Sequence, residues 1–479
     1  MILDSDSCYK AFRARDYRFD GRFIVAVSST RVYCRPVCRV RAPKKENCRF
    51  FSNPAAAEAL GYRPCLRCRP ELAPGNAASD LSVRLAHAAA RLIEDGTIAA
   101  GGTEHVASRL GVSSRHLRRI FQAQYGVAPV EFAQTQRLLT AKQLLMDTSI
   151  SVTDIALASG FRSVRRLNSA FKEKYRITPS AVRRSRKTDH FEGVTSELGF
   201  RPPYAWEAFL SFLGKRAIPG VELVEEGRYL RTARIRHSGR ELFGWIEIAK
   251  AANRNALQVR FSPSLLAATA PVLARVKDLA DLSCDPVAVS EVLGSLAART
   301  PGLRVPGAFD GFELAIRAIL GQQVSVSAAR TLAGRLARAF GERVEAPTSK
   351  LEFAFPTAAD IAKQKLRTIT AIGLTSSRAQ SILALSSAVA DEKISLTPAS
   401  DLETTLQKLQ SLPGIGQWTA QYITMRALRW PDAFLHTDLG ARKALPKRSP
   451  REILVMAEAW RPWRSYALMH LWQSLSDTE

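Results

Sequence analysis

Residues 412–422 read LPGIGQWTAQY, and residues 434–445 read FLHTDLGARKAL. The first stretch predicts a tight turn that opens a helix, where Gly414 and Gly416 let the backbone approach a phosphate and free N–H groups favour an anion. The second places Asp438 at the start of a helix, where a carboxylate either caps the helix or stabilises positive charge that develops on a substrate. Because glycine turns and capping aspartates are both common, the rest of the chain must decide between these interpretations.

The flanking sequence predicts two structural units around these motifs. Apolar residues alternate in RYLRTARIRH, ELFGWIEIAK and NALQVRFS, which indicates strands. After these stretches the apolar spacing is almost entirely helical. We therefore expect a small β-rich α+β domain over residues 194–265 and an all-α domain over residues 266–479.

These two units resemble the AlkA DNA-3-methyladenine glycosylases of the helix-hairpin-helix superfamily. The resemblance rests on RPPYAWEAFLSFL, ARTPGLRVPGAFDGFELAIRAILGQQVSVSAA, LPGIGQWTAQY and AWRPWRSYALMHLW. It implies that Asp438 is the catalytic carboxylate and that Gly414 and Gly416 bind the DNA backbone. Cationic alkylated purines stack well on aromatic rings, although core packing is the more frequent role of such rings. The residues implied for an aromatic base pocket are Phe212, Trp418, Tyr422 and Trp472.

The chain departs from the family pattern at several positions near this site. Trp418 occupies the place of the lysine found in lyase-capable members, which implies a monofunctional enzyme that uses water. His436 and Thr437 replace a prolyl-acidic step before the catalytic aspartate, and Leu439 replaces an aromatic neighbour. Gln323 stands where the family has an apolar residue that fills the gap left by the flipped base, and Gln can also fill that gap.

Five of the seven cysteines lie between Cys34 and Cys68, which indicates a metal or catalytic site in a reducing compartment. Cys34 and Cys38 form a C-x3-C pair, and Cys65 and Cys68 form a C-x2-C pair. Two such pairs supply the four thiolates of one closed Zn²⁺ site. The spacing alone fits a structural and a reactive centre equally well, but the surrounding Arg and Lys residues favour a reactive thiolate.

The stretches VYCRPVCRVRAPKKENCRFF and GYRPCLRCRPE resemble the methylphosphotriester-acceptor domain of the Ada DNA-repair proteins, and we place this domain at residues 1–75. The resemblance implies that all four paired cysteines bind zinc and that Cys34 irreversibly accepts a methyl group from a DNA phosphotriester. Methylation changes the charge of the centre from minus two to minus one, so we expect it to raise DNA affinity. Three further cysteines are expected to be buried thiols: Cys8, Cys48 and Cys284.

Residues 80–187 carry two copies of one pattern, EHVASRLGVSSRHLRRIFQAQYGVAPV and VTDIALASGFRSVRRLNSAFKEKYRITPS. Each copy predicts a helix, a turn at Gly111 or Gly160, and a basic second helix. The pair resembles the AraC-type DNA-binding domain, which implies sequence-specific binding and transcriptional control. Arginines of the second helices suit base edges in the major groove, unless they merely solvate an exposed face. They are Arg115, Arg118, Arg119, Arg162, Arg165 and Arg166.

The chain carries 69 Lys and Arg against 44 Asp and Glu, which gives a net charge of +25. Such a charge attracts nucleic acid by counterion release, although it also fits a protein held at an anionic membrane surface. The start MILDSDSCYK does not resemble a secretory signal, and no stretch is apolar enough to span a bilayer. We expect a cytoplasmic, nucleoid-associated bacterial protein.

The predicted molecule is a multidomain, mainly α protein with α+β parts that repairs alkylated DNA and activates transcription. Its expected partners are one Zn²⁺, damaged and operator double-stranded DNA, and RNA polymerase. A monomer is expected because the two reading units are in tandem. Without a Pro-Cys-His-Arg stretch, we expect no repair of alkylated guanine oxygen. Two alternatives remain: a methylation-sensing regulator whose glycosylase-like half only binds DNA, and a glycosylase with purely structural zinc.

Overall fold

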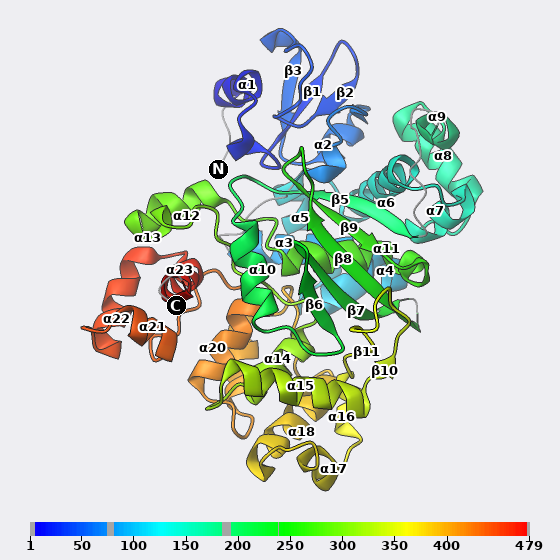
Figure 1. Ribbon diagram of the computed structural model, residues 1–479. Helices are drawn as coiled ribbons and strands as arrows, with labels where there is room; N and C mark the ends of the chain where they lie inside the picture. Colours follow the sequence, from blue (N-terminus) through cyan, green and yellow to red (C-terminus); the bar gives the residue numbers. More distant parts are fainter. Residues whose placement is uncertain (1–4, 74–80, 184–192, 238, 477–479) are drawn as a thin grey trace.

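The computed structural model describes residues 5–73, 81–183, 193–237 and 239–476. The domain boundaries that we expect between residues 75 and 80 and at residue 187 lie outside this part of the chain. Figure 1 shows the N-terminal unit at the top, a five-stranded sheet in the centre, and the C-terminal helices below and to the left.

The N-terminal unit is a small mixed sheet with two helices. The sheet has the order β3-β1-β2-β4, in which β4 pairs parallel with β2 and the other pairs are antiparallel. Asn53 caps α2 by accepting the backbone N–H of Ala56 at 3.0 Å. The elements are α1 Ser5–Ala14, β1 Ile24–Val27, β2 Val32–Cys34, β3 Cys48–Phe51, α2 Pro54–Ala59 and β4 Arg63–Pro64.

The next unit consists of helices and contains both predicted helix-turn-helix copies. Gly111 and Gly160 have φ of 67° and 79°, the left-handed conformation that these turns need and glycine adopts freely. Ser113 and Ser163 then cap the second helix of each copy. The helices are α3 Leu81–Glu94, α4 Thr97–Arg109, α5 Ser114–Tyr125, α6 Pro129–Asp147, α7 Val152–Ala158, α8 Val164–Tyr175 and α9 Pro179–Arg183.

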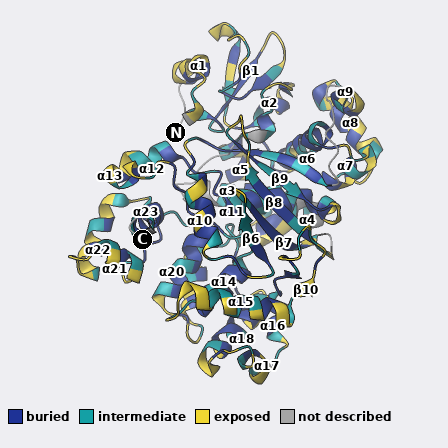
Figure 2. Ribbon diagram, viewed as in Figure 1, coloured by how far each residue is buried: buried dark blue, intermediate teal, exposed yellow. Residues whose placement is uncertain are grey.

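A five-stranded antiparallel sheet forms the centre of the molecule, in the order β5-β9-β8-β7-β6. The alternating stretches predicted as strands correspond to its three longest neighbouring strands, β7, β8 and β9. Figure 2 shows these strands and α10 mainly buried, with exposed residues gathered on the outer helices. The elements are β5 Val194–Gly199, α10 Trp206–Gly214, β6 Glu222–Glu225, β7 Arg228–His237, β8 Arg240–Lys250 and β9 Ala256–Phe261.

The rest of the chain is helical apart from one short strand pair, β10 Glu342–Arg343 and β11 Phe353–Ala354. Its first helices are α11 Thr269–Leu279, α12 Pro286–Leu293, α13 Ser295–Ala298, α14 Gly311–Leu320 and α15 Val326–Phe340. They are followed by α16 Ala358–Ala362, α17 Leu366–Thr370, α18 Ser376–Ala390 and α19 Leu402–Gln410. The last are α20 Gln417–Arg426, α21 Leu439–Ala444, α22 Pro450–Ala457 and α23 Arg464–Ser476.

Two apolar cores organise this half of the molecule. One joins the central sheet, α11 and α23, and the other joins α14, α15, α18 and α20. Tyr422 packs against both cores, so α20 lies where they meet. The first core also contains residues of α6, α7 and α8, because α6 lies against β5. The second helix-turn-helix copy is therefore packed onto the sheet through a shared apolar core.

A buried carboxylate joins the N-terminal unit to the tandem helices. Glu58, only 2% exposed, accepts hydrogen bonds from Tyr33 Oη at 2.7 Å, Thr135 Oγ1 at 2.7 Å and Tyr175 Oη at 3.2 Å. Glu58 lies on α2 and its three partners lie on β2, α6 and α8; these four residues are called the Glu58 junction below. Because each hydrogen-bond partner is a hydroxyl group, the junction aligns four elements without a direct ion pair.

Within the described residues, no helix is both long and apolar enough to cross a membrane.

Candidate catalytic site and zinc centre

The turn between α19 and α20 uses its two glycines in different ways. Gly414 has φ of 74°, and a Cβ there would lie 2.1 Å from Ser381 Oγ, so both conformation and space demand glycine. A Cβ on Gly416 would meet nothing within 4 Å. Gly416 is the N-cap of α20, and its open surroundings leave the start of this helix accessible to a phosphate group.

Asp438 caps α21 and is also bound by two tryptophans. Its Oδ1 accepts the backbone N–H of Ala441 at 3.0 Å and Trp472 Nε1–H at 2.8 Å, while Oδ2 accepts Trp418 Nε1–H at 3.0 Å. The carboxylate is 9% exposed. Three donors fix the direction of the carboxylate. The capping and functional interpretations of this aspartate are therefore compatible in one geometry.

The four aromatic residues predicted for the base pocket lie together around Asp438. The rings of Trp418 and Tyr422 are nearly parallel, with centroids 5.3 Å apart and an interplanar angle of 6°. Trp472 lies between Tyr422, at 6.4 Å, and Phe212, at 6.3 Å. The rings belong to α10, α20 and α23, which come from distant parts of the chain and lie near one another in Figure 1.

Two arginines that the sequence analysis missed support these rings. Arg426 donates to Tyr422 Oη at 2.6 Å, and its guanidinium lies 5.0 Å from the Phe212 ring centroid. The guanidinium of Arg216 lies 3.9 Å from the same centroid. Arg426 follows Tyr422 by four residues on α20, a spacing that places both on one helical face and could have indicated their contact, whereas Arg216 lies in the turn after α10.

The cations around Tyr422 change its acidity. Burial raises the pKa of Tyr422, but the neighbouring Arg426, Arg216 and Arg317 outweigh burial, so the pKa lies below its ordinary value of 10.0. The oxygen of Tyr422 therefore accepts a strong, charge-assisted hydrogen bond from Arg426.

A cleft of about 330 Å³ opens beside Phe212 and Trp472, between α10, the start of α15 and α23. Gln323 is exposed, with φ of 54°, in the loop that leads into α15. Leu439, which follows Asp438, is 63% exposed and covers little of the site. His436 is half-buried and Thr437 is exposed, so the altered step before Asp438 lies at the edge of the core.

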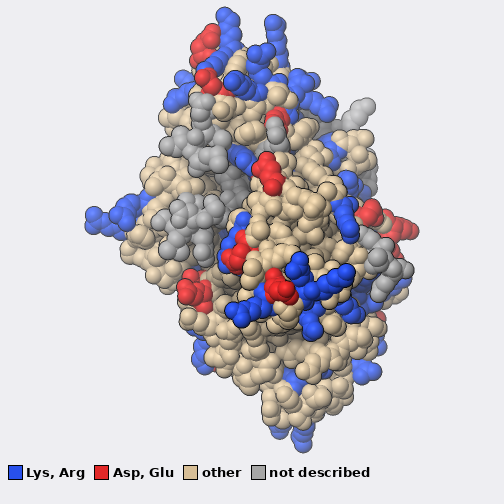
Figure 3. Space-filling model, turned by 90° about the vertical axis from the view of Figure 1, so that its left-hand side faces the viewer, with Lys and Arg blue, Asp and Glu red and all other residues tan. Residues whose placement is uncertain are grey.

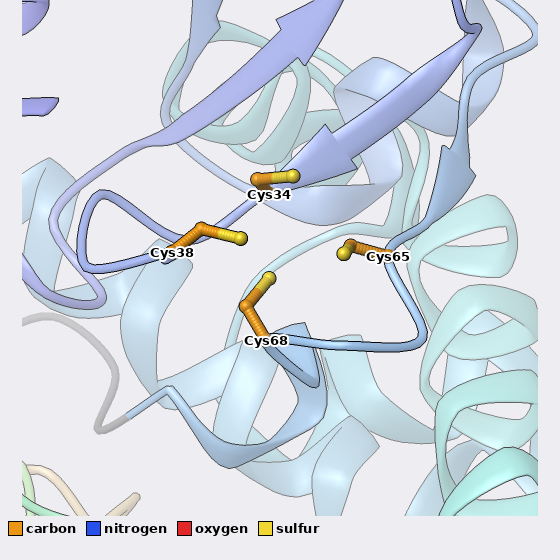
Figure 4. Close-up of side chains that lie close together, drawn as sticks. All are labelled: Cys34, Cys38, Cys65 and Cys68. Atoms are coloured by element: carbon orange, nitrogen blue, oxygen red, sulfur yellow. The ribbon is translucent and has the colours of Figure 1, made fainter. Parts of the chain in front are cut away.

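The four paired cysteines converge on one point (Figure 4). Their sulfur atoms all lie within 4.8 Å of one another, and tetrahedral Zn²⁺ with ordinary Zn–S bonds needs separations of about 3.8 Å. Hydrogen bonds among the sulfurs raise the pKa of the Cys34 thiol and lower that of Cys65. A set of four sulfurs that compete for protons in this way fits a bound divalent cation.

Backbone groups distinguish the cysteines of this centre. Cys68 Sγ accepts the backbone N–H of Arg35 at 3.3 Å, and backbone hydrogen bonds from Val40 and Cys68 help lower the pKa values of Cys38 and Cys65. The hydrogen bonds that raise and lower the pKa of Cys34 come from the other three sulfurs, so the four thiols act as one group. The remaining thiols, Cys8, Cys48 and Cys284, are buried as expected.

The predicted base-reading arginines lie on exposed positions. Arg115, Arg118 and Arg119 project from α5, while their neighbours Leu117 and Phe121 are fully buried. The corresponding residues on α8 and its preceding turn, Arg162, Arg165 and Arg166, are exposed as well.

Lys and Arg side chains gather on the surface. Figure 3 shows them over the end formed by the N-terminal unit and again across the middle of the face, with acidic side chains among them in both places. This distribution agrees with a protein that contacts a polyanion at more than one place.

Four family models match the chain. The metal binding domain of Ada matches residues 7–71, and a helix-turn-helix domain matches residues 106–185. The AlkA N-terminal domain matches residues 195–310, and the HhH-GPD superfamily of base excision DNA repair proteins matches residues 316–464. The matches follow one another along the chain, as the three resemblances predict.

Relatives with the same organisation occur in bacteria. A probable bifunctional transcriptional activator/DNA repair enzyme AlkA from Mycobacterium tuberculosis is 38% identical over 99% of this chain and 97% of that protein. DNA-3-methyladenine glycosylase 2 of Escherichia coli is 37% identical over 57% of this chain and 95% of its own. The Escherichia coli bifunctional transcriptional activator/DNA repair enzyme Ada is 37% identical over 33% of this chain and 43% of its own.

Proposed function

Because the chain belongs to the family of bifunctional transcriptional activator/DNA repair enzymes that join Ada and AlkA domains, we propose that it excises alkylated bases with Asp438 and accepts methyl groups on Cys34. The observation that carries the first activity is the carboxylate of Asp438, held by Trp418, Trp472 and the backbone of Ala441 beside four aromatic rings. The proposed units are residues 1–75, 80–187, 194–265 and 266–479.

Base excision follows from the chemistry of the substrate and the charge of the site. A base such as 3-methyladenine or 7-methylguanine is cationic and stacks on the rings of the pocket once it is flipped. As the N-glycosyl bond breaks, its electrons leave with the base and the sugar becomes positive. The carboxylate of Asp438, which is largely buried, stabilises that charge. Water completes hydrolysis, and Trp418, which cannot form a Schiff base, makes the enzyme monofunctional.

The DNA is held by groups around the pocket. Gly414 and Gly416 shape the hairpin whose open helix start receives a phosphate. Gln323, exposed in the loop before α15, enters the duplex where the flipped base has left. Phe212 and Trp472 form the wall that the base faces.

Methyl transfer uses the zinc centre. When bound by Cys34, Cys38, Cys65 and Cys68, Zn²⁺ keeps these sulfurs as thiolates at neutral pH. The Cys34 sulfur attacks the methyl carbon of a methylphosphotriester, an S–C bond forms, and the C–O bond breaks with its electrons on the phosphate. Because the thioether is stable, each molecule acts once.

The tandem helices direct the protein to its operators. Arginines of α5 and α8 read successive segments of the major groove, and the methylated zinc centre repels the DNA less. Activation then involves RNA polymerase, and two reading units in one chain allow a monomer to act in the bacterial nucleoid.

Release of free base tests the glycosylase. Purified protein is incubated with a duplex that contains one 3-methyladenine or 7-methylguanine, beside Asp438→Asn as the matched variant. We expect release by the wild type and a loss of at least about 100-fold in the variant, since the amide cannot neutralise the developing charge. DNA binding without any release by the wild type would favour a regulator whose glycosylase half only binds DNA.

Methyl uptake tests the zinc centre. After exposure to methylphosphotriester DNA, mass spectrometry should find one added methyl group on Cys34 and none in Cys34→Ser. A wild-type protein that stays unmethylated under these conditions would leave the zinc with a structural role only.

A further inference from the structure

Gly440, two residues after Asp438, has no side chain, and the site is built around this absence. Gly440 is the second residue of α21. A Cβ at this position would lie 2.7 Å from Trp472 Cδ1, 2.9 Å from Trp472 Nε1 and 3.0 Å from Asp438 Oδ1. Real Cβ atoms essentially never come within 3.0 Å of another heavy atom, so a side chain here would force the indole to move and would press on the carboxylate.

The backbone itself does not call for glycine at this place. Gly440 lies within α21 and is not among the residues with positive φ. In a helix, glycine is less favourable than alanine because it loses more conformational freedom on folding. A residue that is locally unfavourable yet sterically required indicates a functional demand.

The space that the absent side chain would fill is occupied by Trp472. Its indole N–H reaches Asp438 Oδ1 at 2.8 Å, while its ring is nearly parallel to that of Phe212, at an interplanar angle of 16°. The ring also contacts Tyr422, so it has neighbours on more than one side. Because α21 packs directly on α23, a methyl group at residue 440 would press on Trp472 at the edge of the ring that donates to the carboxylate.

We propose that Gly440 is a positioning residue for base excision: the lack of a side chain lets Trp472 reach Asp438 and turn its carboxylate toward the pocket. This inference rests on the proposed role of Asp438. Gly440 touches no substrate, and it acts only through the Trp472–Asp438 hydrogen bond. The glycines of the hairpin and the basic surface lie elsewhere, so DNA binding does not depend on it.

Gly440→Ala tests this role under single-turnover conditions. We expect the rate of base release to fall about 10- to 100-fold, the effect of losing a hydrogen bond to a charged group. The Kd for damaged DNA should stay unchanged, and the melting temperature should fall by only a few degrees, because the helical preference of alanine offsets part of the steric overlap. A merely structural defect would instead lower the melting temperature strongly together with the rate.

Combining Gly440→Ala with Trp472→Phe shows whether the slower base release of Gly440→Ala depends on Trp472. Trp472→Phe removes the N–H group and shortens the ring, so it should itself slow base release. In that background, Gly440→Ala should cost little further, because the contact it breaks is already absent. Equal losses from Gly440→Ala in both backgrounds would overturn the proposal.

Wild type and Asp438→Asn measured in parallel separate the two levels of inference. If the wild type releases base, the aspartate variant does not, and Gly440→Ala matches the wild type, only the role of Gly440 is refuted. If the wild type releases no base, the proposed excision itself fails.

Discussion

Single side chains at the site have environments that their sequence neighbours do not reveal. Tyr422 is a predicted pocket residue, but its acidity depends on Arg426, Arg216 and Arg317, which come from three different helical or loop segments. The resemblance to a family indicates that a ring is present, and the structure indicates what charge surrounds it.

This environment leads to a prediction about pH. Because the pKa of Tyr422 is lowered, folded Tyr422 loses its proton at a lower pH than the unfolded residue, and the folded state gains stability as pH rises through the lowered value. Ultraviolet titration of the phenols should show one early step in the wild type that is missing in Tyr422→Phe. Identical titrations would mean that the arginines do not act on this ring.

The other buried tyrosines make this measurement clear. Burial raises the pKa of six of them, so they ionise later than the free amino acid and their steps do not overlap with that of Tyr422. They are Tyr33, Tyr125, Tyr175, Tyr204, Tyr229 and Tyr466.

At the level of helices and strands, local patterns predict most of what is found. The two glycine turns and serine caps of the tandem helices, the alternating strands and the paired cysteines are each determined by residues close in sequence. The positions of Asp438 and the four pocket rings follow from the family resemblance, and the structure brings these five residues together.

The contacts between elements could not be predicted in this way. Glu58 meets Thr135 and Tyr175 across 77 and 117 residues of chain, and a spacing pattern holds no information at that range. Gly440 is another example, since its importance depends on the path of α23 and not on its own helix. Tertiary packing decides both.

The Glu58 junction gives a prediction about the elements that it joins. Burial raises the pKa of Glu58 more than its hydrogen bonds lower it. Between the ordinary value of 4.5 and that raised value, the folded chain holds a proton that the unfolded chain has lost, so stability falls as pH rises. Glu58→Gln should therefore become more stable relative to the wild type with rising pH. A constant difference between the two across this range would contradict the assignment.

Replacing Glu58 with alanine should destabilise the fold more than replacing it with glutamine. Glu58→Ala leaves three hydroxyl groups unpaired and a cavity, which together cost about 3 kcal/mol or more of the free energy of unfolding. All seven tryptophans lie at or beyond Trp206, so tryptophan fluorescence follows only the glycosylase half. Urea unfolding should show an earlier transition by circular dichroism and a smaller shift by fluorescence, because the tandem helices share an apolar core with the central sheet.

Considered as a whole, the molecule places its two repair chemistries in separate regions. The zinc centre lies in the unit at the top of Figure 1, and α20, α21 and α23 lie at the lower left. The Glu58 junction ties the N-terminal unit to the tandem helices. Unfolding of this unit should therefore destabilise the DNA-reading helices before it affects the glycosylase half.

Zinc removal tests this arrangement. A strong chelator should unfold the N-terminal unit and weaken operator binding, since small zinc domains depend on their metal. Base release should stay unchanged, and added Zn²⁺ should restore operator binding. Loss of base release on chelation would show that the zinc unit supports the glycosylase half directly.

The apolar core that α6, α7 and α8 share with the central sheet determines what happens when the chain is divided into two fragments. A cut between residues 183 and 193 would separate the tandem helices from the glycosylase half at the domain boundary that the sequence predicts. Such a cut would expose apolar surface on both fragments, at α6 on the N-terminal fragment and at β5 on the C-terminal fragment. Each fragment of this chain would therefore tend to aggregate or to rebind its counterpart.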